Sequence, residues 1–181
     1  MSGAATDFLR RCLTDAIEAE DLFESRLREF ANQGDDPDVQ SAFLSHADVL
    51  RLRRADLTAR LEELGGAESG GKSPLSPLIG TASPEGEFAR VQEEQTLHNL
   101  IAAFGIENSE CALYEVLSTL ARAIGDSVTE SLACAALADQ QETAKRVFSF
   151  LPSRSKIAFN MLTPNELDPA VETKAFQNRV V

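Results

Sequence analysis

The sequence predicts an all-α protein: a four-helix bundle made of two antiparallel helix hairpins joined by a long crossover. Apolar residues recur at spacings of four and three in four segments, as on the packed face of a helix. Gly, Pro and Ser interrupt the chain between these segments, where helices would end. We expect helices over 7–33, 37–64, 94–124 and 127–151. No strand pattern is present on which a Rossmann unit could form.

The first hairpin has clear end signals. Thr6 or Asp7 can cap the first helix, which ends before Gly34, and Asp36-Pro37 starts the second, which stops at Gly65-Gly66. The core-facing row of the first helix contains one glutamate: Leu9, Leu13, Ala16, Glu20, Phe23, Leu27, Phe30. The row of the second contains a histidine and an arginine: Val39, Phe43, His46, Leu50, Arg53, Leu57, then Leu61 or Leu64.

The second hairpin also carries polar residues on its packed faces. A separate turn is expected over 85–93, and Asp126 is expected to cap the last helix, which should end before Pro152. The row of the third helix contains two glutamates: Leu100, Ala103, Glu107, Glu110, Tyr114, Leu117, Ala121, Ile124. The row of the fourth contains two acidic residues: Val128, Leu132, Ala135, Asp139, Glu142, Val147.

Two segments lie outside these helices. Residues 65–84 are rich in Gly, Ser and Pro, and about 20 residues are too many for a tight turn between neighbouring helices. They suit a crossover along the bundle, held down by its apolar piece PLSPLIG. Residues 152–181 are expected to be a C-terminal tail with one short helix over 169–176. The bundle domain would then span residues 1–151.

The polar residues on the packed faces should meet at mid-height. Counting from the turns, Glu20 lies level with the stretch between His46 and Arg53, and Glu110 level with the stretch between Asp139 and Glu142. An ionised carboxylate facing a core costs several kcal/mol unless a cation or a proton compensates it. The sequence therefore predicts a central polar belt, and the function depends on what neutralises it.

Composition excludes several classes of function. The chain has 181 residues, a net charge of −12 and a pI of about 4.6, so neither nucleic acid nor anionic lipid is an expected partner. No apolar run reaches the roughly 18 residues of a membrane span, and the N-terminus has no export signal, so we expect a cytoplasmic protein. A homodimer is compatible with such an acidic bundle. Cys12, Cys111 and Cys134 form no metal-binding spacing and are expected to be reduced thiols.

Several segments resemble a known family. They are Ala19-Glu20, AFLSH from Ala42, PLIG from Pro77 and LIAAFGIENSECALY from Leu100. Over about residues 8–151 the chain resembles the YciE/YciF-type bacterial branch of the ferritin-like superfamily, which looks rubrerythrin-like. In that superfamily, carboxylates and histidines from four helices hold two metal ions. Five residues match the pattern of that branch: Glu20, Glu107, Glu110, Tyr114 and Asp139.

The chain also departs from that branch. Helix 37–64 has Val49 where the branch is acidic and Arg53 where it tends to have a neutral polar residue. Asn108 replaces a histidine of the third helix. The acidic run of the fourth helix is thinned to Asp139-Gln140-Gln141-Glu142, and neither helix that should hold an E-x-x-H motif has one.

Two functions follow from these observations. In the first, the metal site is degenerate: Arg53 replaces metal, pairs with Glu20 and another carboxylate, and the protein is a stress-associated or structural bundle without a cofactor. In the second, the protein is an iron or manganese di-metal oxidase, peroxidase-like enzyme or metal store. Its ligands would be Glu20, Glu110, Asp139 and Glu142, with Glu107 and His46 as further candidates. A bundle that binds a small organic ligand is a third interpretation, and whether the protein is an enzyme is left open.

Overall fold

The computed structural model describes residues 3–66, 79 and 89–163. They form four helices: α1 (Gly3–Gln33), α2 (Pro37–Glu63), α4 (Gln92–Ile124) and α5 (Ser127–Leu162). No strand occurs among these residues, so the predicted all-α class is confirmed. The described part before α4, residues 89–91, is not helical, and α4 begins two residues earlier than predicted.

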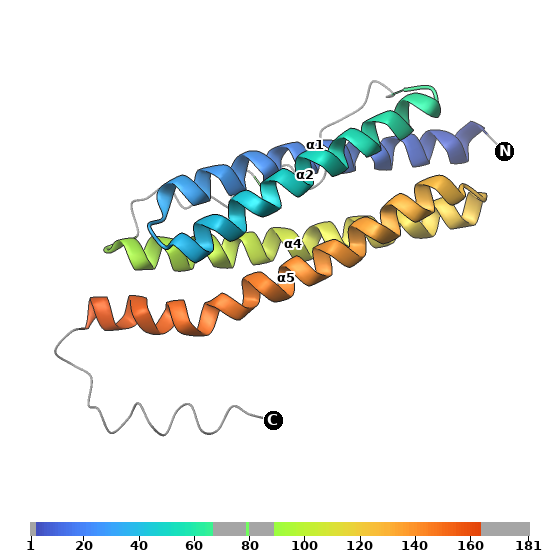
Figure 1. Ribbon diagram of the computed structural model, residues 1–181. Helices are drawn as coiled ribbons and strands as arrows, with labels where there is room; N and C mark the ends of the chain where they lie inside the picture. Colours follow the sequence, from blue (N-terminus) through green and yellow to red (C-terminus); the bar gives the residue numbers. More distant parts are fainter. Residues whose placement is uncertain (1–2, 67–78, 80–88, 164–181) are drawn as a thin grey trace, which may run out of the picture.

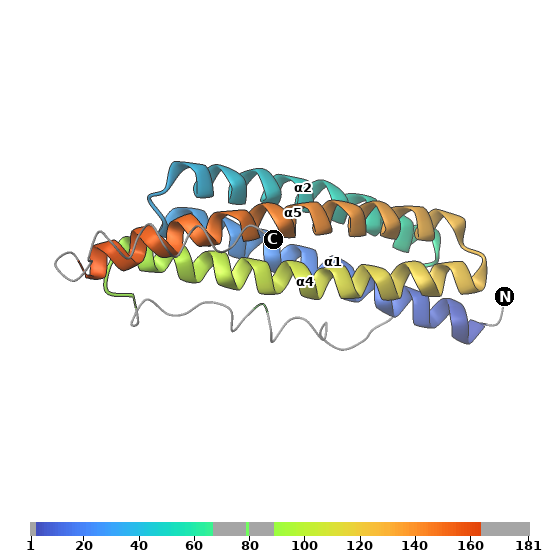
Figure 2. The same cartoon turned by 90° about the horizontal axis from the view of Figure 1, so that it is seen from below.

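The helices pair as two hairpins. α1 packs against α2 and α4 against α5, and the hairpins meet through α1 on α4 and, less closely, α2 on α5 (Figures 1 and 2). The end of α2 and the start of α4 lie at opposite ends of the bundle (Figure 1). That arrangement requires a long connection, as predicted. Apart from Gly65, Gly66 and Ile79, the crossover 65–84 lies outside the described residues.

Local sequence signals explain the helix ends at the two hairpin turns. The predicted start of the first helix at Thr6 or Asp7 is wrong, because α1 already begins at Gly3. The Asp36 side chain accepts hydrogen bonds from the backbone N–H groups of Asp38 and Val39, both at 3.1 Å, directly before Pro37 at the first helical position. Gly125 ends α4 with φ of 77°, a conformation that favours glycine. Asp126 then caps α5 by accepting from the Thr129 N–H at 3.0 Å.

The core lies in two clusters, one on each side of the polar belt. One contains Phe23, Phe30, Phe43 and Leu50, and the other contains apolar residues nearer the opposite end: Leu9, Leu13, Leu57, Leu117. Every residue of the core-facing row predicted for α1 is buried. Ile79 of the crossover is buried in the first cluster, where the apolar piece of that segment was expected to be held.

The predicted end of the last helix at Leu151 is wrong. Pro152 lies inside α5, which continues to Leu162 and changes direction in its last part (Figure 1). An interior proline costs roughly 3 kcal/mol through its missing N–H and its clash with the preceding turn. Tertiary contacts offset this cost: Arg154 donates to both oxygens of Asp36 at 2.8 and 3.0 Å, and Ala158 is buried. The short helix predicted over 169–176 lies outside the described residues.

The predicted packed face of the last helix is also wrong, by one position over most of its length, although Val147 is buried as predicted. Val128, Asp139 and Glu142 are exposed, whereas the buried residues of α5 are mostly small: Thr129, Ala133, Ala136, Gln140, Ala144, Val147, Ala158. Close approach of α4 and α5 favours small side chains between them, so the larger apolar residues of α5 do not mark its core-facing side. A pattern search for large apolar residues therefore misplaces this helix.

Candidate functional site

The central belt is a layer of polar side chains between the two core clusters. It draws on all four helices and contains Glu20, His46, Arg53, Glu107, Glu110, Tyr114 and Gln140. All but Arg53, which is 9% exposed, are buried residues. The belt exists because these residues occupy core-facing positions of otherwise apolar helices.

One corner of the belt is built around Glu20. Arg53 Nη1 donates a hydrogen bond to Glu20 Oε1 at 3.1 Å, and the Tyr114 hydroxyl donates to the same oxygen. The guanidinium carbon of Arg53 lies 5.5 Å from the centre of the Tyr114 ring, within cation–π distance. A carboxylate that is 1% exposed thus has a cation and a hydroxyl donor as direct partners.

A second corner joins α2 to α4. His46 Nε2 lies 3.1 Å from Glu107 Oε1, an ion-pair distance without hydrogen-bond geometry, and neither carboxylate oxygen of Glu107 accepts a hydrogen bond. The His46 ring packs edge-on against Phe23 with ring centres 5.6 Å apart, which fixes its plane.

The third corner contains a residue that the sequence analysis missed. Gln140 of α5 is fully buried, and its Nε2 donates to Glu110 Oε2, while Glu110 Oε1 has no partner. Gln140 lies one position after Asp139, on the row that also contains Ala136 and Ala144. The signal that could have found it is this run of small residues at helical spacing.

Burial dominates the ionisation of the belt. It raises the pKa of Glu20, although Arg53 works against the shift, and that of Glu107, where His46 opposes it. The pKa of Glu110 is raised well above the usual range, first by burial and then by the negative charges of Glu20 and Glu107. Burial also works against the charge on Arg53, but Glu20, Tyr114 and Glu110 outweigh it and raise its pKa.

Two predicted ligands lie outside the belt. Asp139 is 67% exposed and approaches Arg53 from outside, with its Oδ2 3.7 Å from Arg53 Nη2. Glu142 is 80% exposed and pairs with Lys145 at 3.6 Å on the surface. Of the six predicted metal ligands, the structure therefore brings four into the belt: Glu20, His46, Glu107, Glu110.

The belt resembles a di-metal site in one respect. Four buried carboxylate oxygens of the belt have no hydrogen-bond partner, as free ligands would: Glu20 Oε2, both oxygens of Glu107 and Glu110 Oε1. Yet among the described residues no three His, Cys, Asp or Glu side chains gather where they could hold a metal ion. Arg53 also places a positive charge in the belt, and α5 contributes an amide rather than a carboxylate. The residues present do not fit a pair of metal ions.

The remaining sequence expectations concern the membrane and the cysteines. No helix in the described part of the chain combines the length and the apolar character that a membrane span requires. All three cysteines are described, and none is paired: Cys12 is buried, Cys111 half-buried and Cys134 exposed.

Solved structures share the fold. The chain is similar to the Escherichia coli stress protein YciF, with 20% identity over 86% of this chain and 99% of that one, and a TM-score of 0.76. It is similar to YcfI, described as a putative structural protein from Rhodopseudomonas palustris, with 20% identity, 79% and 92% coverage and a TM-score of 0.72. A dodecameric thioferritin from Bacteroides fragilis, related to bacterioferritin, matches with 18% identity, 87% and 92% coverage and a TM-score of 0.67.

These likenesses confirm the ferritin-like fold class that the sequence predicted. No curated protein sequence matches the chain. A family description does match: the "Domain of unknown function (DUF892)" covers residues 4–158, which include all of the belt. The chain has the ferritin-like fold and belongs to the DUF892 family.

Proposed function

We propose that this protein is a ferritin-like bundle with a degenerate carboxylate site, in which the guanidinium of Arg53 takes the place of metal. The observation that supports the proposal most directly is the set of partners around Glu20. There a carboxylate buried to 99% already has a cation at 3.1 Å and the hydroxyl of Tyr114. A metal ion at this corner would have to displace a charge that is already paired.

Charge balance supports the same proposal. The belt contains three glutamates, and Arg53 compensates one of them. Burial raises the pKa of Glu107 and raises that of Glu110 well above the usual range, which favours the neutral, protonated form of both carboxyl groups. A neutral belt is thus reached with protons and one arginine alone. Such a bundle acts through its structure and surface rather than through metal redox chemistry.

We further propose an association with stress. The support is the similarity to the Escherichia coli protein described as a stress protein. At 20% identity this likeness shows the fold alone, so the role itself is a proposal. A cytoplasmic location and a homodimer stay predictions from the sequence.

The test combines metal content with thermal melting. Elemental analysis of the wild-type protein, purified and kept under reducing, anaerobic conditions, is expected to show far less than one metal ion per chain. Manganese or ferrous iron should leave its melting temperature unchanged. Arg53→Met, which leaves Glu20 unpaired, should melt lower and regain part of the loss when divalent metal is added.

Surface variant Glu142→Gln serves as the control, since it removes a carboxylate that lies outside the belt. It should respond to metal as the wild type does. Two results together would reject the arginine proposal: a wild type with roughly two metal ions per chain, as in two-metal sites, and an Arg53→Met variant that melts like wild type.

A di-metal oxidase, peroxidase-like enzyme or metal store remains the second candidate. The observation that favours it is the set of buried carboxylate oxygens without a hydrogen-bond partner, at Glu20, Glu107 and Glu110. The di-metal candidate predicts that the wild type binds iron or manganese and that Glu107→Gln abolishes the binding. The same metal analysis distinguishes the two candidates.

A further inference from the structure

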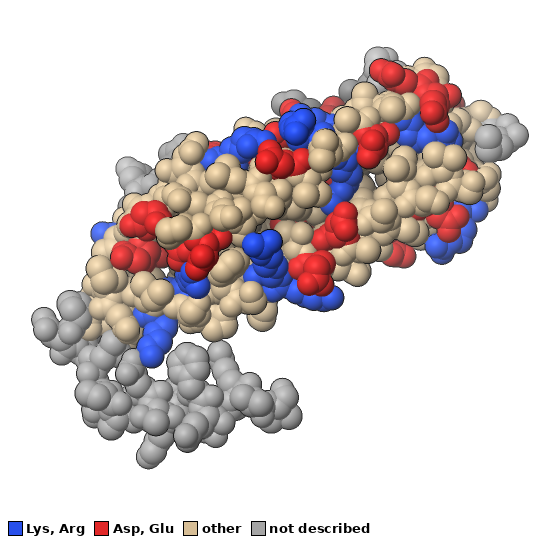
Figure 3. All heavy atoms as spheres, in the orientation of Figure 1, with Lys and Arg blue, Asp and Glu red and all other residues tan. Residues whose placement is uncertain are grey.

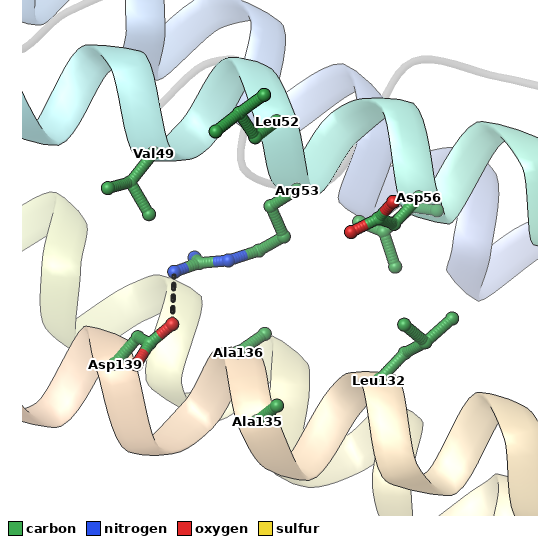
Figure 4. A pocket seen from close by; sticks show the side chains of 9 residues that line it. Val49, Leu52, Arg53, Asp56, Leu132, Ala135, Ala136 and Asp139 are labelled. Carbon is green, nitrogen blue, oxygen red and sulfur yellow. Dashed lines mark ion pairs between the residues drawn. The ribbon is translucent and has the colours of Figure 1, made fainter.

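A groove lies between α2 and α5, midway along the bundle. It has a volume of about 210 Å³, and its walls are mainly apolar, with three charged groups: Val49, Leu52, Arg53, Asp56, Leu57, Leu132, Ala135, Ala136, Asp139 (Figure 4). The groove opens on the face where α2 and α5 lie, on which acidic and basic side chains are interspersed (Figure 3). Its floor is the outer side of the belt at Arg53.

Arg53 presents an unused hydrogen-bond donor to this groove. Its side chain is 91% buried, and while Nη1 donates to Glu20, Nη2 makes no hydrogen bond. Figure 4 shows the side chain extending from α2 across the groove towards Asp139 of α5. A buried charged donor without an acceptor is costly, so an acceptor placed at Nη2 would be stabilised.

Asp139 covers this donor without satisfying it. Its Oδ2 lies 3.7 Å from Nη2, beyond hydrogen-bond distance, and two-thirds of its side chain is exposed. Because the side chain lies at the surface, it can rotate into solvent at little cost. Rotation would leave Nη2 open to another oxygen entering from the groove.

The groove walls indicate the rest of the ligand. Val49 and Leu52 are exposed apolar side chains beside the groove, and the facing wall on α5 is formed by Leu132, Ala135 and Ala136. A hydrocarbon chain lying here would remove their apolar surface from water. Val49 is also the position where the resemblance to the YciE/YciF-type branch led us to expect an acidic residue.

The sign of the ligand's charge follows from burial. Asp56 and Asp139 line the groove but are exposed, so water and salt screen their repulsion of an anion. The Arg53 side chain is 91% buried, so its attraction is screened much less. The buried Glu20 offsets part of that charge from the Nη1 side, but the Nη2 donor is left without a hydrogen-bond acceptor. We propose that this groove binds a short-chain aliphatic carboxylate, whose carboxylate replaces Asp139 on Arg53 Nη2 and whose chain covers Val49, Leu52 and Leu132.

Calorimetric titration with hexanoate tests the proposal. The wild type should bind it saturably, and affinity should rise roughly fourfold for each methylene from butyrate to hexanoate. Asp139→Asn, which removes the competing charge but keeps the shape, should bind hexanoate several-fold more tightly. Ala135→Phe, which fills the groove, should lose the binding. Glu142→Gln, one turn further along α5 and exposed, is the matched control and should bind like wild type.

Three outcomes would overturn the proposal: no saturable binding of hexanoate, weaker binding by Asp139→Asn, or tighter binding of hexylammonium than of hexanoate. The substituted residues are exposed, and melting curves verify that each variant is folded. The inference rests on Arg53 holding the place given to it in the proposed function, but the two tests fail separately. Metal content tests the proposed function, whereas the effect of Asp139→Asn on hexanoate binding tests the proposal that the groove binds an aliphatic carboxylate.

Discussion

Arginine–carboxylate pairs occur at both ends and at the centre of this bundle, and ionisation differs between the two regions. At the ends, Arg154 pairs with Asp36 at 2.8 Å and Arg60 with Asp126 at 2.8 Å. The pKa of Asp36 is lowered by its bonds to Arg154, and that of Asp126 is lowered because bonds from Arg60 and Thr129 outweigh burial. At the centre, burial outweighs Arg53 and raises the pKa of Glu20.

The difference teaches that the balance between hydrogen-bond donors and burial decides whether the pKa of such a carboxylate falls or rises. Asp126 is itself buried, but it accepts hydrogen bonds from Arg60 and from the Thr129 hydroxyl and N–H, and Asp36 accepts from Arg154 and two backbone N–H groups. Glu20 accepts from Arg53 and Tyr114 on one oxygen, while its other oxygen has no hydrogen-bond partner, so burial prevails there. Each end aspartate also caps a helix, Asp36 for α2 and Asp126 for α5, and each is bound by an arginine of the other helix. α2 and α5 are thereby held together at both ends, while the groove lies between them at the centre.

The largest expected effect comes from breaking the central pair. Arg53→Met should lower the free energy of unfolding by about 3 kcal/mol, because it leaves Glu20 buried without its cation. Adding Glu20→Gln should recover most of the loss, since a neutral pair needs no compensation. Urea denaturation of the single and double variants measures both. A double variant as unstable as Arg53→Met would show that the arginine contributes packing rather than charge.

Breaking an end pair should cost less. Asp126→Ala removes a helix cap and the partner of Arg60, with an expected loss of about 2 kcal/mol by urea denaturation. Asp35→Ala is the matched control, because Asp35 is exposed and next to a cap without being one. Its change should stay within about 0.5 kcal/mol. Equal losses for the two variants would contradict the role given to the cap.

Acidification should affect the two regions in opposite directions. The raised pKa values of Glu20, Glu107 and Glu110 mean that the native protein binds protons that the unfolded chain releases, so stability rises as the pH falls from about 7 towards 5. The lowered pKa values of Asp36 and Asp126 mean that below about pH 4 the unfolded chain binds more protons, so stability falls again. Urea midpoints measured across this pH range follow both changes in stability, the rise on mild acidification and the fall at lower pH.

Glu110→Gln tests the first of these changes, the rise in stability on mild acidification. The amide resembles the protonated carboxyl, so the variant should be more stable than wild type at neutral pH, by on the order of 1 kcal/mol, since one pKa unit corresponds to about 1.4 kcal/mol. Its stability should also change less between about pH 7 and 5. A variant that keeps the full wild-type pH dependence would assign that dependence to Glu20 or Glu107 instead.

The smallest effect is expected from the surface. Glu142→Gln removes only an exposed pair with Lys145 and should change the free energy of unfolding by less than about 0.5 kcal/mol. The measurement is the same urea series. A loss of several kcal/mol would place Glu142 in the belt, as the sequence analysis had it.

The sequence by itself determined the fold class, three of the four packed faces and most of the belt. Apolar residues at spacings of four and three mark the core side of α1, α2 and α4, and Glu20, His46, Glu107 and Glu110 stand in those rows. The glycine, proline and aspartate signals placed both hairpin turns. These features are local, so they can be read along one helix at a time.

Only the tertiary structure decided how α5 sits. The core-facing side of α5 is made of small residues because α4 lies close. The helix is therefore oriented with Gln140 in the belt and with Asp139 and Glu142 at the surface. Its continuation through Pro152 depends on Arg154 reaching Asp36, a residue far away in the sequence. In both cases the deciding energy comes from a neighbouring helix, and a pattern within α5 does not contain it.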